Sequence, residues 1–330
     1  MSVRVRHAAS VAAAFGLVAL AAAVWLAVDR RPPEWDYANH LERGVLCVRD
    51  LGRGELREVL RRGSFYPPLV PCLGGLATVL AGSDVGAGVA VIVVFLAIGM
   101  AATYLLGRRV GGAAAGAAAA VVFGTAPFVV WQSLRFQLDV PLAAMVALAL
   151  EALLRTDAFA RPAASLAAGL VFGLGMLTKP PFVVYVLPPV LLALARARWP
   201  RALPGLVGFA LAGTFVALPW YGPRLFGLSA QIGARSFRQA AEQGHPDPLT
   251  AASLLYYPLN FAVQLGVVGV ALFAVGLVVC ARRRDWFSLV ALLPLFVFLA
   301  IQNKQLRYTL PLVPAAAVVA GAGFAALGPR

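Results

Sequence analysis

The sequence predicts an all-α polytopic membrane protein with about ten transmembrane helices. Of the 330 residues, 61% are hydrophobic and only 13% carry a charge, whereas a soluble domain of this length carries about 25%. Apolar stretches recur from end to end, so the composition excludes a water-soluble fold and a disordered chain. The net charge of +14 fits cytoplasmic loops that follow the positive-inside rule. Because no nucleic-acid-binding motif is visible, we expect no nucleic-acid partner.

The first apolar stretch, residues 8–28, follows Arg4 and Arg6 and predicts a spanning helix whose N-terminus is cytoplasmic. A cleaved signal peptide is the competing interpretation. Its apolar region would be unusually long, and the residues around Asp29 form no small-residue cleavage site. The stretch is therefore interpreted as the first membrane span.

Residues 29–84 predict an extracytoplasmic segment of juxtamembrane helices. Residues 29–65 are polar, and their eight arginines run against the positive-inside rule, which favours an anionic ligand. Apolar residues at helical spacing on both sides of Gly52-Arg53-Gly54 predict two short amphipathic helices with a break between them. Residues 66–82 are apolar but rich in proline and glycine, which favours a helix that lies in the outer leaflet without crossing it.

Nine later apolar segments predict the remaining crossings. Arginines in short hinges, such as Arg108 and Arg109, should face the cytoplasm, which places both termini inside. The whole chain is then one integral domain of a bacterial inner membrane, with the outer connections at 132–139, 179–181, 222–255 and 303–307. The nine segments are 85–107, 111–131, 140–155, 163–178, 182–195, 203–221, 256–280, 286–302 and 308–327.

Ionisable side chains are expensive at membrane depth, so their positions are informative. The predicted topology brings the ionisable residues of several outer connections to one face of the membrane. A convergence of this kind favours an active site, while a static network of salt bridges is the structural alternative. The candidates are Glu34, Asp36, Arg135, Asp139, Lys179, Lys304, Arg307 and Tyr308.

Lysine is scarce in this chain, which contains 26 arginines but only Lys179 and Lys304. An ammonium is a compact point charge and a guanidinium a planar fork, so the two do not substitute freely in a confined site. Both lysines are therefore candidates for a specific role. The three cysteines show no metal-binding or redox spacing. Pairing of Cys47 with Cys72 stays open at this stage.

Five short motifs carry a resemblance to the GT-C glycosyltransferases that use polyprenyl-phosphate-linked sugars, among them the protein O-mannosyltransferases and the lipid A aminoarabinose transferases. The run from Gly173 to Pro181 is similar to their "GLxxLTKxP" stretch. The other four agree in order and spacing, and the five together cover about 280 residues. They are Tyr66-Pro67-Pro68-Leu69, Leu134-Arg135 to Asp139-Val140-Pro141-Leu142, Leu218-Pro219-Trp220-Tyr221 and Lys304 to Pro311.

The resemblance implies transfer of a sugar from a polyprenyl-phosphate donor to a hydroxyl of a protein or glycolipid acceptor at the outer face of the lipid bilayer. Asp36 would be the general base of an inverting displacement. Lys179, Lys304 and Arg307 would bind the lipid phosphate, with Arg135 a further candidate. Asp139 would orient an arginine or bind the acceptor or sugar, and Tyr308 belongs to the last motif.

The first outer loop departs from the family pattern. Many members have Asp-Glu where this chain has Glu34-Trp35-Asp36, which resembles the acidic variant of some metal-binding GT-C enzymes. The sequence requires no cofactor, and a divalent metal at Glu34 and Asp36 stays open. A compact member, a fragment and half of a two-part enzyme also stay open. The alternative functions are a flippase or transporter of polyprenyl-linked sugars and a non-catalytic membrane scaffold.

Overall fold

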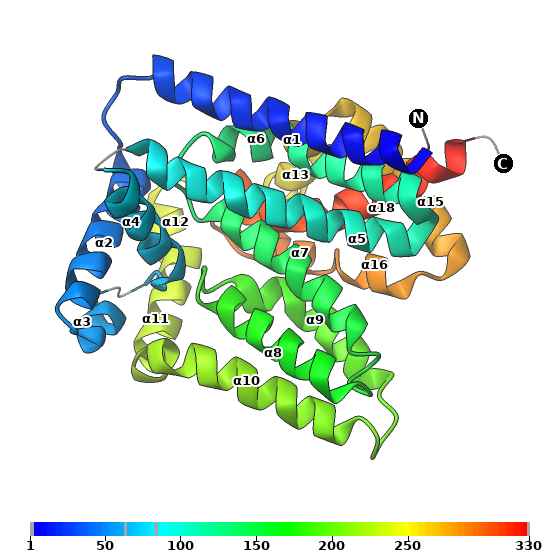
Figure 1. Ribbon diagram of the computed structural model, residues 1–330. Coiled ribbons are helices and arrows are strands. Elements are labelled where there is room, and N and C mark those ends of the chain that lie inside the picture. Colours follow the sequence, from blue (N-terminus) through cyan, green and yellow to red (C-terminus); the bar gives the residue numbers. More distant parts are fainter. Residues whose placement is uncertain (1–2, 63–64, 83–84, 329–330) are drawn as a thin grey trace.

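The computed structural model describes residues 3–62, 65–82 and 85–328, and all regular structure within these ranges is helical. This confirms the predicted all-α class. Residues 63–64 and 83–84 of the predicted segment 29–84 lie outside the described residues, as do 329–330 at the end of the chain. The main bundle consists of long, nearly antiparallel helices, and a smaller group of helices lies across one of its ends (Figure 1).

The first half of the chain forms a long first helix, a group of three short helices and a long fifth helix. Gly111 and Gly112 leave the helical conformation inside α5, so this element consists of two helices joined at a kink. Two separate segments were predicted here. The bounds are α1 Val3–Val28, α2 Trp35–Gly52, α3 Leu56–Arg61, α4 Leu69–Ala81, α5 Val85–Thr125, α6 Pro127–Ser133, α7 Asp139–Arg155 and α8 Pro162–Met176.

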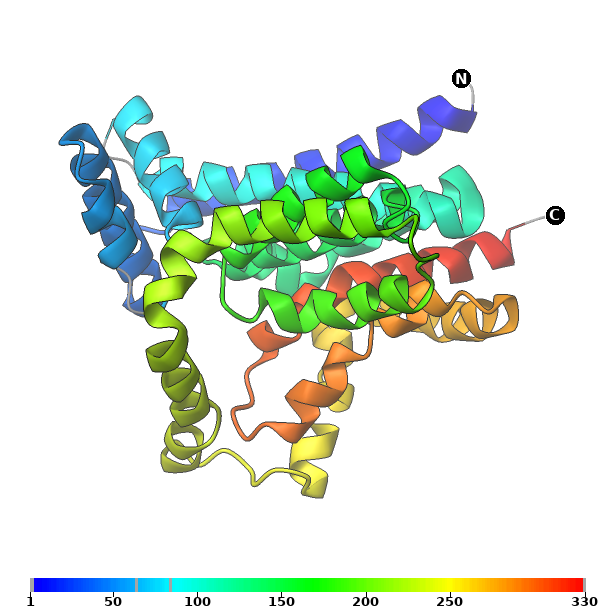
Figure 2. The same ribbon diagram turned by 90° about the horizontal axis from the view of Figure 1, so that it is seen from below.

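The second half of the chain contains shorter elements and three 3-10 turns. Figure 2 shows α11 turning away from the direction of α10, so that the 222–255 connection runs across the end of the bundle. The bounds are α9 Phe182–Ala195, α10 Leu203–Tyr221, η1 Gly222–Arg224, α11 Leu225–Ser236, α12 Arg238–Glu242, α13 Ala251–Leu259, α14 Phe261–Leu265, α15 Val267–Arg283, α16 Trp286–Val290, α17 Pro294–Ala300, η2 Leu306–Tyr308, η3 Leu310–Leu312 and α18 Val313–Leu327.

Small residues let the central helices pack closely. α18 packs against α5 and α15, and α7 packs against α5 and α8. A Cβ atom added to Gly321 of α18 would lie 2.4 Å from the carbonyl oxygen of Ala115, and one added to Gly276 of α15 would lie 1.8 Å from that of Val319. Close approach at small residues is the usual means of helix association in membranes.

The two ends of the bundle differ in content. Both termini and the turn between α15 and α16 lie at one end, whereas α2, α3 and α4 lie at the other (Figure 1). The side chain of Arg283 donates to the carbonyl oxygen of Val110, which joins two of the arginine-rich hinges at the end that carries the termini. The end of the bundle that carries both termini therefore also carries arginine-rich hinges.

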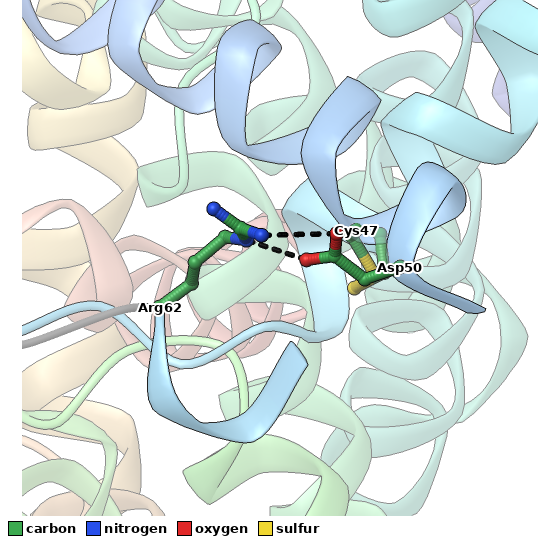
Figure 3. The surroundings of a disulfide bond; sticks show 4 residues. Cys47, Asp50 and Arg62 are labelled. Carbon is green, nitrogen blue, oxygen red and sulfur yellow. Dashed lines mark hydrogen bonds and ion pairs between the residues drawn. A yellow bond between two sulfur atoms is a disulfide. The ribbon is translucent and has the colours of Figure 1, made fainter. Parts of the chain in front are cut away.

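The predicted amphipathic pair is present as α2 and α3, separated at Arg53 and Gly54. Cys47 of α2 forms a disulfide with Cys72 of α4, which answers the question that the sequence left open. Close to this disulfide, the fully buried Asp50 accepts hydrogen bonds from Arg62 (Figure 3). The disulfide and the ion pair tie the three short helices into one unit.

Two of the predicted apolar segments are divided among several helices. Residues 256–280 divide among α13, α14 and α15, and the chain bends by 115° between Leu265 and Val267. Gly266 supplies the bend because its φ of +80° is readily adopted only by glycine. Residues 286–302 are likewise divided between α16 and α17, and Pro294 begins the second helix. Average hydropathy does not register such breaks.

Four helices within the described ranges are long and apolar enough to cross a bilayer, and the bent pair would be a fifth crossing. α4, α8 and α9 are shorter apolar helices, as is the region of α16 and α17. Several apolar helices are thus established, while the count of ten crossings stays a prediction.

Candidate functional site

Two ion pairs lie at the end of the bundle that carries α2. Arg307 Nη1 donates to Asp36 Oδ2 at 2.7 Å, and Lys179 Nζ donates to Asp139 Oδ1 at 2.6 Å. The first pair joins residues 271 positions apart, and the second joins residues 40 positions apart. The fold therefore brings together four of the predicted site residues from four separate connections.

Local structure explains where each charge lies. Asp36 is in the first turn of α2, and Asp139 is the first residue of α7. A helix N-terminus carries partial positive charge, which stabilises a carboxylate at both positions. Lys179 lies in the turn between α8 and α9, and Arg307 lies in η2 just before α18. All four residues lie at or beyond helix ends.

Charge and burial tune the groups around Asp36. Burial by itself would raise the pKa of Asp36, but the hydrogen bond and charge of Arg307, with further help from Lys179, lower it overall. The pKa of Arg307 is raised, since the charges of Asp139 and Asp36 outweigh the effect of its burial. Both members of this pair are therefore charged at neutral pH.

A polar cleft of about 520 Å³ opens beside this pair. Its wall includes Glu34, Asp36, Arg135 and Arg307. The guanidinium of Arg135 lies 4.5 Å from the ring centroid of Trp131, an arrangement that holds its charge in place. Glu34 and Arg135 are thus near Asp36, as predicted from the sequence.

An apolar pocket of about 250 Å³ also has Arg307 in its wall. Three cationic residues, Lys179, Arg235 and Arg307, contribute to its wall, together with Tyr308. No aspartate or glutamate contributes to the lining that the described residues provide. The remainder of the wall is largely aromatic and aliphatic, so the pocket suits an anion attached to an apolar chain. Arg307 lines both the cleft and this pocket.

Lys304 has a different environment from the other predicted residues. Its Nζ donates to the carbonyl oxygens of Phe298, Leu299 and Ile301, at 2.7 and 3.0 Å for the first two. These carbonyls belong to the C-terminal end of α17, where a cation compensates unpaired acceptors. Lys304 lines neither the cleft nor the apolar pocket.

Sequence reasoning missed two residues near the site. His40 lies one helical turn after Asp36, is 2% exposed and packs edge-to-face on Tyr66. Burial lowers its pKa to about 4, despite the opposing effect of Asp36. Arg235 of α11 reaches the apolar pocket from the predicted outer connection 222–255. The four-residue spacing from Asp36 was the available signal for His40, while Arg235 had none.

The residues around Asp36 do not fit a metal centre. Within the described ranges, no group of three or more His, Cys, Asp or Glu side chains is placed to hold a metal ion. Asp36 is paired with Arg307, and Glu34 is exposed and caps no backbone group with its side chain. We therefore derive no step through a metal.

Comparison with known proteins supports the resemblance found in the motifs. Residues 66–221 match the model of the dolichyl-phosphate-mannose-protein mannosyltransferase family. The match begins at Tyr66 and ends at Tyr221, so it runs from the first motif to the fourth. No curated protein sequence matches the chain.

Solved structures share the fold. ArnT from Cupriavidus metallidurans bound to undecaprenyl phosphate superposes with a TM-score of 0.67 at 18% identity, over 93% of this chain and 59% of ArnT. Its apo form gives 0.65 and 19%, over 94% and 58%. The Archaeoglobus fulgidus oligosaccharyltransferase in complex with Zn and sulfate gives 0.51 and 15%, over 78% and 40%. The chain thus spans about three fifths of the ArnT length, and the predicted resemblance to GT-C glycosyltransferases is confirmed.

Proposed function

We propose that the protein is a membrane glycosyltransferase that moves a sugar from a polyprenyl-phosphate donor to an acceptor hydroxyl. The observation that carries this proposal is the position of Arg307. It pairs with Asp36 and lines both a polar cleft and an apolar, cation-bearing pocket. The guanidinium of Arg307 would then contact both the lipid phosphate and the proton-accepting carboxylate of Asp36.

The apolar pocket would hold the donor. Its aromatic and aliphatic wall suits the first isoprene units, and Lys179, Arg235 and Arg307 would surround the phosphate. Asp139, paired with Lys179, would fix the position of that ammonium. The ArnT structure with undecaprenyl phosphate supports a lipid phosphate as the ligand class. Preorganised cations in a site that excludes water stabilise the negative charge that develops on a departing phosphate.

The polar cleft would hold the acceptor, with Glu34 and Arg135 in its wall. The acceptor oxygen would attack the anomeric carbon while its proton passes to Asp36. The bond between that carbon and the phosphate oxygen breaks, and the polyprenyl phosphate leaves with the electron pair. A single displacement inverts the anomeric carbon. A base placed within hydrogen-bond reach typically contributes about 10²–10⁴-fold.

Arg307 would also link donor binding to the strength of the base. In the structure its guanidinium lowers the pKa of Asp36, and a carboxylate so stabilised is a weak proton acceptor. A donor phosphate in the apolar pocket would compete for the same guanidinium. Asp36 would become more basic only when the donor is present.

The proposed orientation places this site outside the cytoplasm, in a bacterial inner membrane that the chain crosses ten times. Support comes from the grouping of both termini with arginine-rich hinges at the opposite end of the bundle. Single cysteines placed at Arg53 and at Arg198, in a background without the natural cysteines, should react with impermeant reagents from opposite sides. Reaction from the same side would overturn the orientation.

Asp36→Asn tests the mechanism because it keeps the shape and removes the base. Mass spectrometry of cells lacking the protein would first identify the lipid-linked sugar that accumulates. The assay would then use this lipid as the donor and measure the release of polyprenyl phosphate. Turnover should fall at least about a hundredfold while undecaprenyl phosphate still binds. Glu42→Gln, an exposed position of the same helix outside the lining of both the cleft and the apolar pocket, is the matched control and should keep most of the activity. Retention of more than about a tenth of the activity in Asp36→Asn would assign the base elsewhere.

The same assay separates the two other functions. A flippase or transporter would move the lipid-linked sugar without releasing polyprenyl phosphate. A non-catalytic scaffold would do neither, and Asp36→Asn would then have no effect on lipid pools.

A further inference from the structure

Two adjoining cavities lie at the end of the bundle that carries both termini, remote from Asp36. The first, of about 260 Å³, has an apolar floor formed by residues of α5, α7 and α18, including Leu106, Leu150 and Val318. The second, of about 390 Å³, lies beside the connections that follow α7 and α9. Leu154 and Phe287 line both cavities, so the two spaces share a wall.

The second cavity is rich in unpaired positive charge. Arg196, Arg198 and Arg201 all contribute to its lining from one short loop. Within the described ranges, none of these three arginines forms an ion pair with a carboxylate. Asp157 is the single acidic residue of this lining, and it lies 4.0 Å from Arg161. The cavity therefore presents a net positive charge to a ligand.

The first cavity carries two further arginines, but these are held by the protein. Arg109 donates to Glu151 at 2.9 and 2.8 Å, and the Glu151 side chain is only 3% exposed. Arg283 donates to the carbonyl oxygen of Val110 at 3.2 Å. The cations of the apolar cavity are thus engaged, and those of its neighbour are available.

Two exposed tryptophans flank the cavities. Trp199 lies within the arginine loop and is 56% exposed, and Trp286 precedes Phe287 and is 53% exposed. Tryptophan is enriched at the level of lipid headgroups, where its ring is apolar and its N–H is solvated. The two tryptophans therefore favour a position of the cavities at headgroup depth in one leaflet.

We propose that these adjoining cavities bind an anionic glycerophospholipid of that leaflet. Its headgroup phosphate lies among Arg196, Arg198 and Arg201, and part of one acyl chain fills the apolar cavity. An amphiphile accounts for both halves of the arrangement, whereas a free anion would leave the apolar half unused. Basic pockets between transmembrane helices commonly recognise anionic lipid headgroups. The proposal is independent of the proposed transferase activity.

Native mass spectrometry of the purified full chain tests this with phosphatidylglycerol, phosphatidylcholine and inorganic phosphate as separate probes. The wild-type protein should retain one phosphatidylglycerol in preference to phosphatidylcholine, and phosphate alone should not compete for it. The triple variant Arg196→Gln/Arg198→Gln/Arg201→Gln should weaken that binding by at least about tenfold. Equal retention of both lipids by the wild-type protein would overturn the proposal.

A matched control uses three arginines of the same end that line neither cavity. Arg108→Gln/Arg282→Gln/Arg284→Gln removes the same charge and should leave lipid retention within about twofold. Equal losses in the two triple variants would reduce the effect to general charge attraction and overturn the site. A second variant, Ala291→Phe, fills the apolar cavity and keeps every arginine. It should also lose the lipid, and if it fails to fold the two arginine variants still decide.

Discussion

The two ion pairs at the candidate site have nearly the same length but very different exposure. The side chains of Lys179 and Asp139 are 7% and 2% exposed, whereas those of Arg307 and Asp36 are 26% and 34% exposed. The buried pair is largely enclosed by the helices that it joins, and only its lysine lines a pocket, whereas both members of the open pair line the polar cleft. Burial, rather than distance, therefore distinguishes Asp139, whose carboxylate holds a lysine in place, from Asp36, whose carboxylate is accessible from the cleft.

The surroundings of the two pairs agree with this division. Asp139 begins α7, and Lys179 lies in the turn after α8, so their bond fixes two bundle helices against each other. Asp36 lies on α2, which the Cys47–Cys72 disulfide joins to α4 (Figure 3). A Cβ added to Gly75 of α4 would lie 2.0 Å from the carbonyl oxygen of Gly44, so α2 and α4 are also in close backbone contact. The helix that carries Asp36 is thus fixed to α4 by a disulfide and by close backbone packing.

The largest expected effect separates the two pairs by stability. Lys179→Met leaves Asp139 charged and buried, and should lower the free energy of unfolding by about 3–5 kcal/mol. Arg307→Met breaks a half-exposed pair and should cost about 0–1 kcal/mol, although turnover is lost. Denaturant titration in detergent measures the first quantity for both variants.

The double variant Asp139→Leu/Lys179→Met is the control, because replacing both charges by apolar groups should restore most of the lost stability. Similar losses for Lys179→Met and Arg307→Met would contradict the distinction between a buried pair and an open pair.

The sequence predicted where charges gather but not how they pair. Membrane burial is costly for ions, so Asp36, Asp139, Lys179 and Arg307 were all expected in connections at one face of the membrane. Which cation meets which carboxylate depends on the packing of helices up to 271 residues apart, and no local pattern carries that information. Hydropathy placed the apolar segments well, yet it could not register the bend at Gly266.

The short helices illustrate the same limit. The break at Arg53 and Gly54 was predictable because glycine and apolar spacing act locally. The turn of Lys304 back onto the carbonyls of α17 was not, since it depends on the path that the chain takes after it leaves that helix at Ile301. Local signals therefore identified elements, and tertiary packing assigned the partners of their side chains.

A second prediction concerns the pH dependence of stability, in which His40 and the Asp36–Arg307 pair act over different pH ranges. The pKa of His40 falls from 6.5 to about 4 on folding, so between these values the unfolded chain binds a proton that the folded protein does not. The free energy of unfolding should therefore decrease by about 3 kcal/mol as pH falls from 6.5 to 4.

His40→Gln should flatten this part of the stability profile. Asp36 affects the free energy of unfolding at lower pH, because its pKa is lowered from 3.8 and its stabilising effect is lost only at pH values below 3.8. An unchanged slope between pH 6.5 and 4 in His40→Gln would show that His40 is not the titrating group.

The smallest expected effect on stability and binding is that of replacing Lys304. The last motif and the scarcity of lysine led us to predict that Lys304 binds the lipid phosphate. Its ammonium is already donated to three carbonyl oxygens at the end of α17, and it lies outside the lining of the apolar pocket. Lys304→Met should therefore lower the free energy of unfolding by about 1.5–3 kcal/mol through the loss of charged hydrogen bonds. Affinity for undecaprenyl phosphate should stay within about twofold of wild type, whereas Lys179→Arg should weaken it because a forked guanidinium does not fit the place of a point charge. The opposite result for Lys304→Met, unchanged stability with reduced affinity, would identify Lys304 as a phosphate ligand. Burial of a cation would then not exclude it from binding the donor.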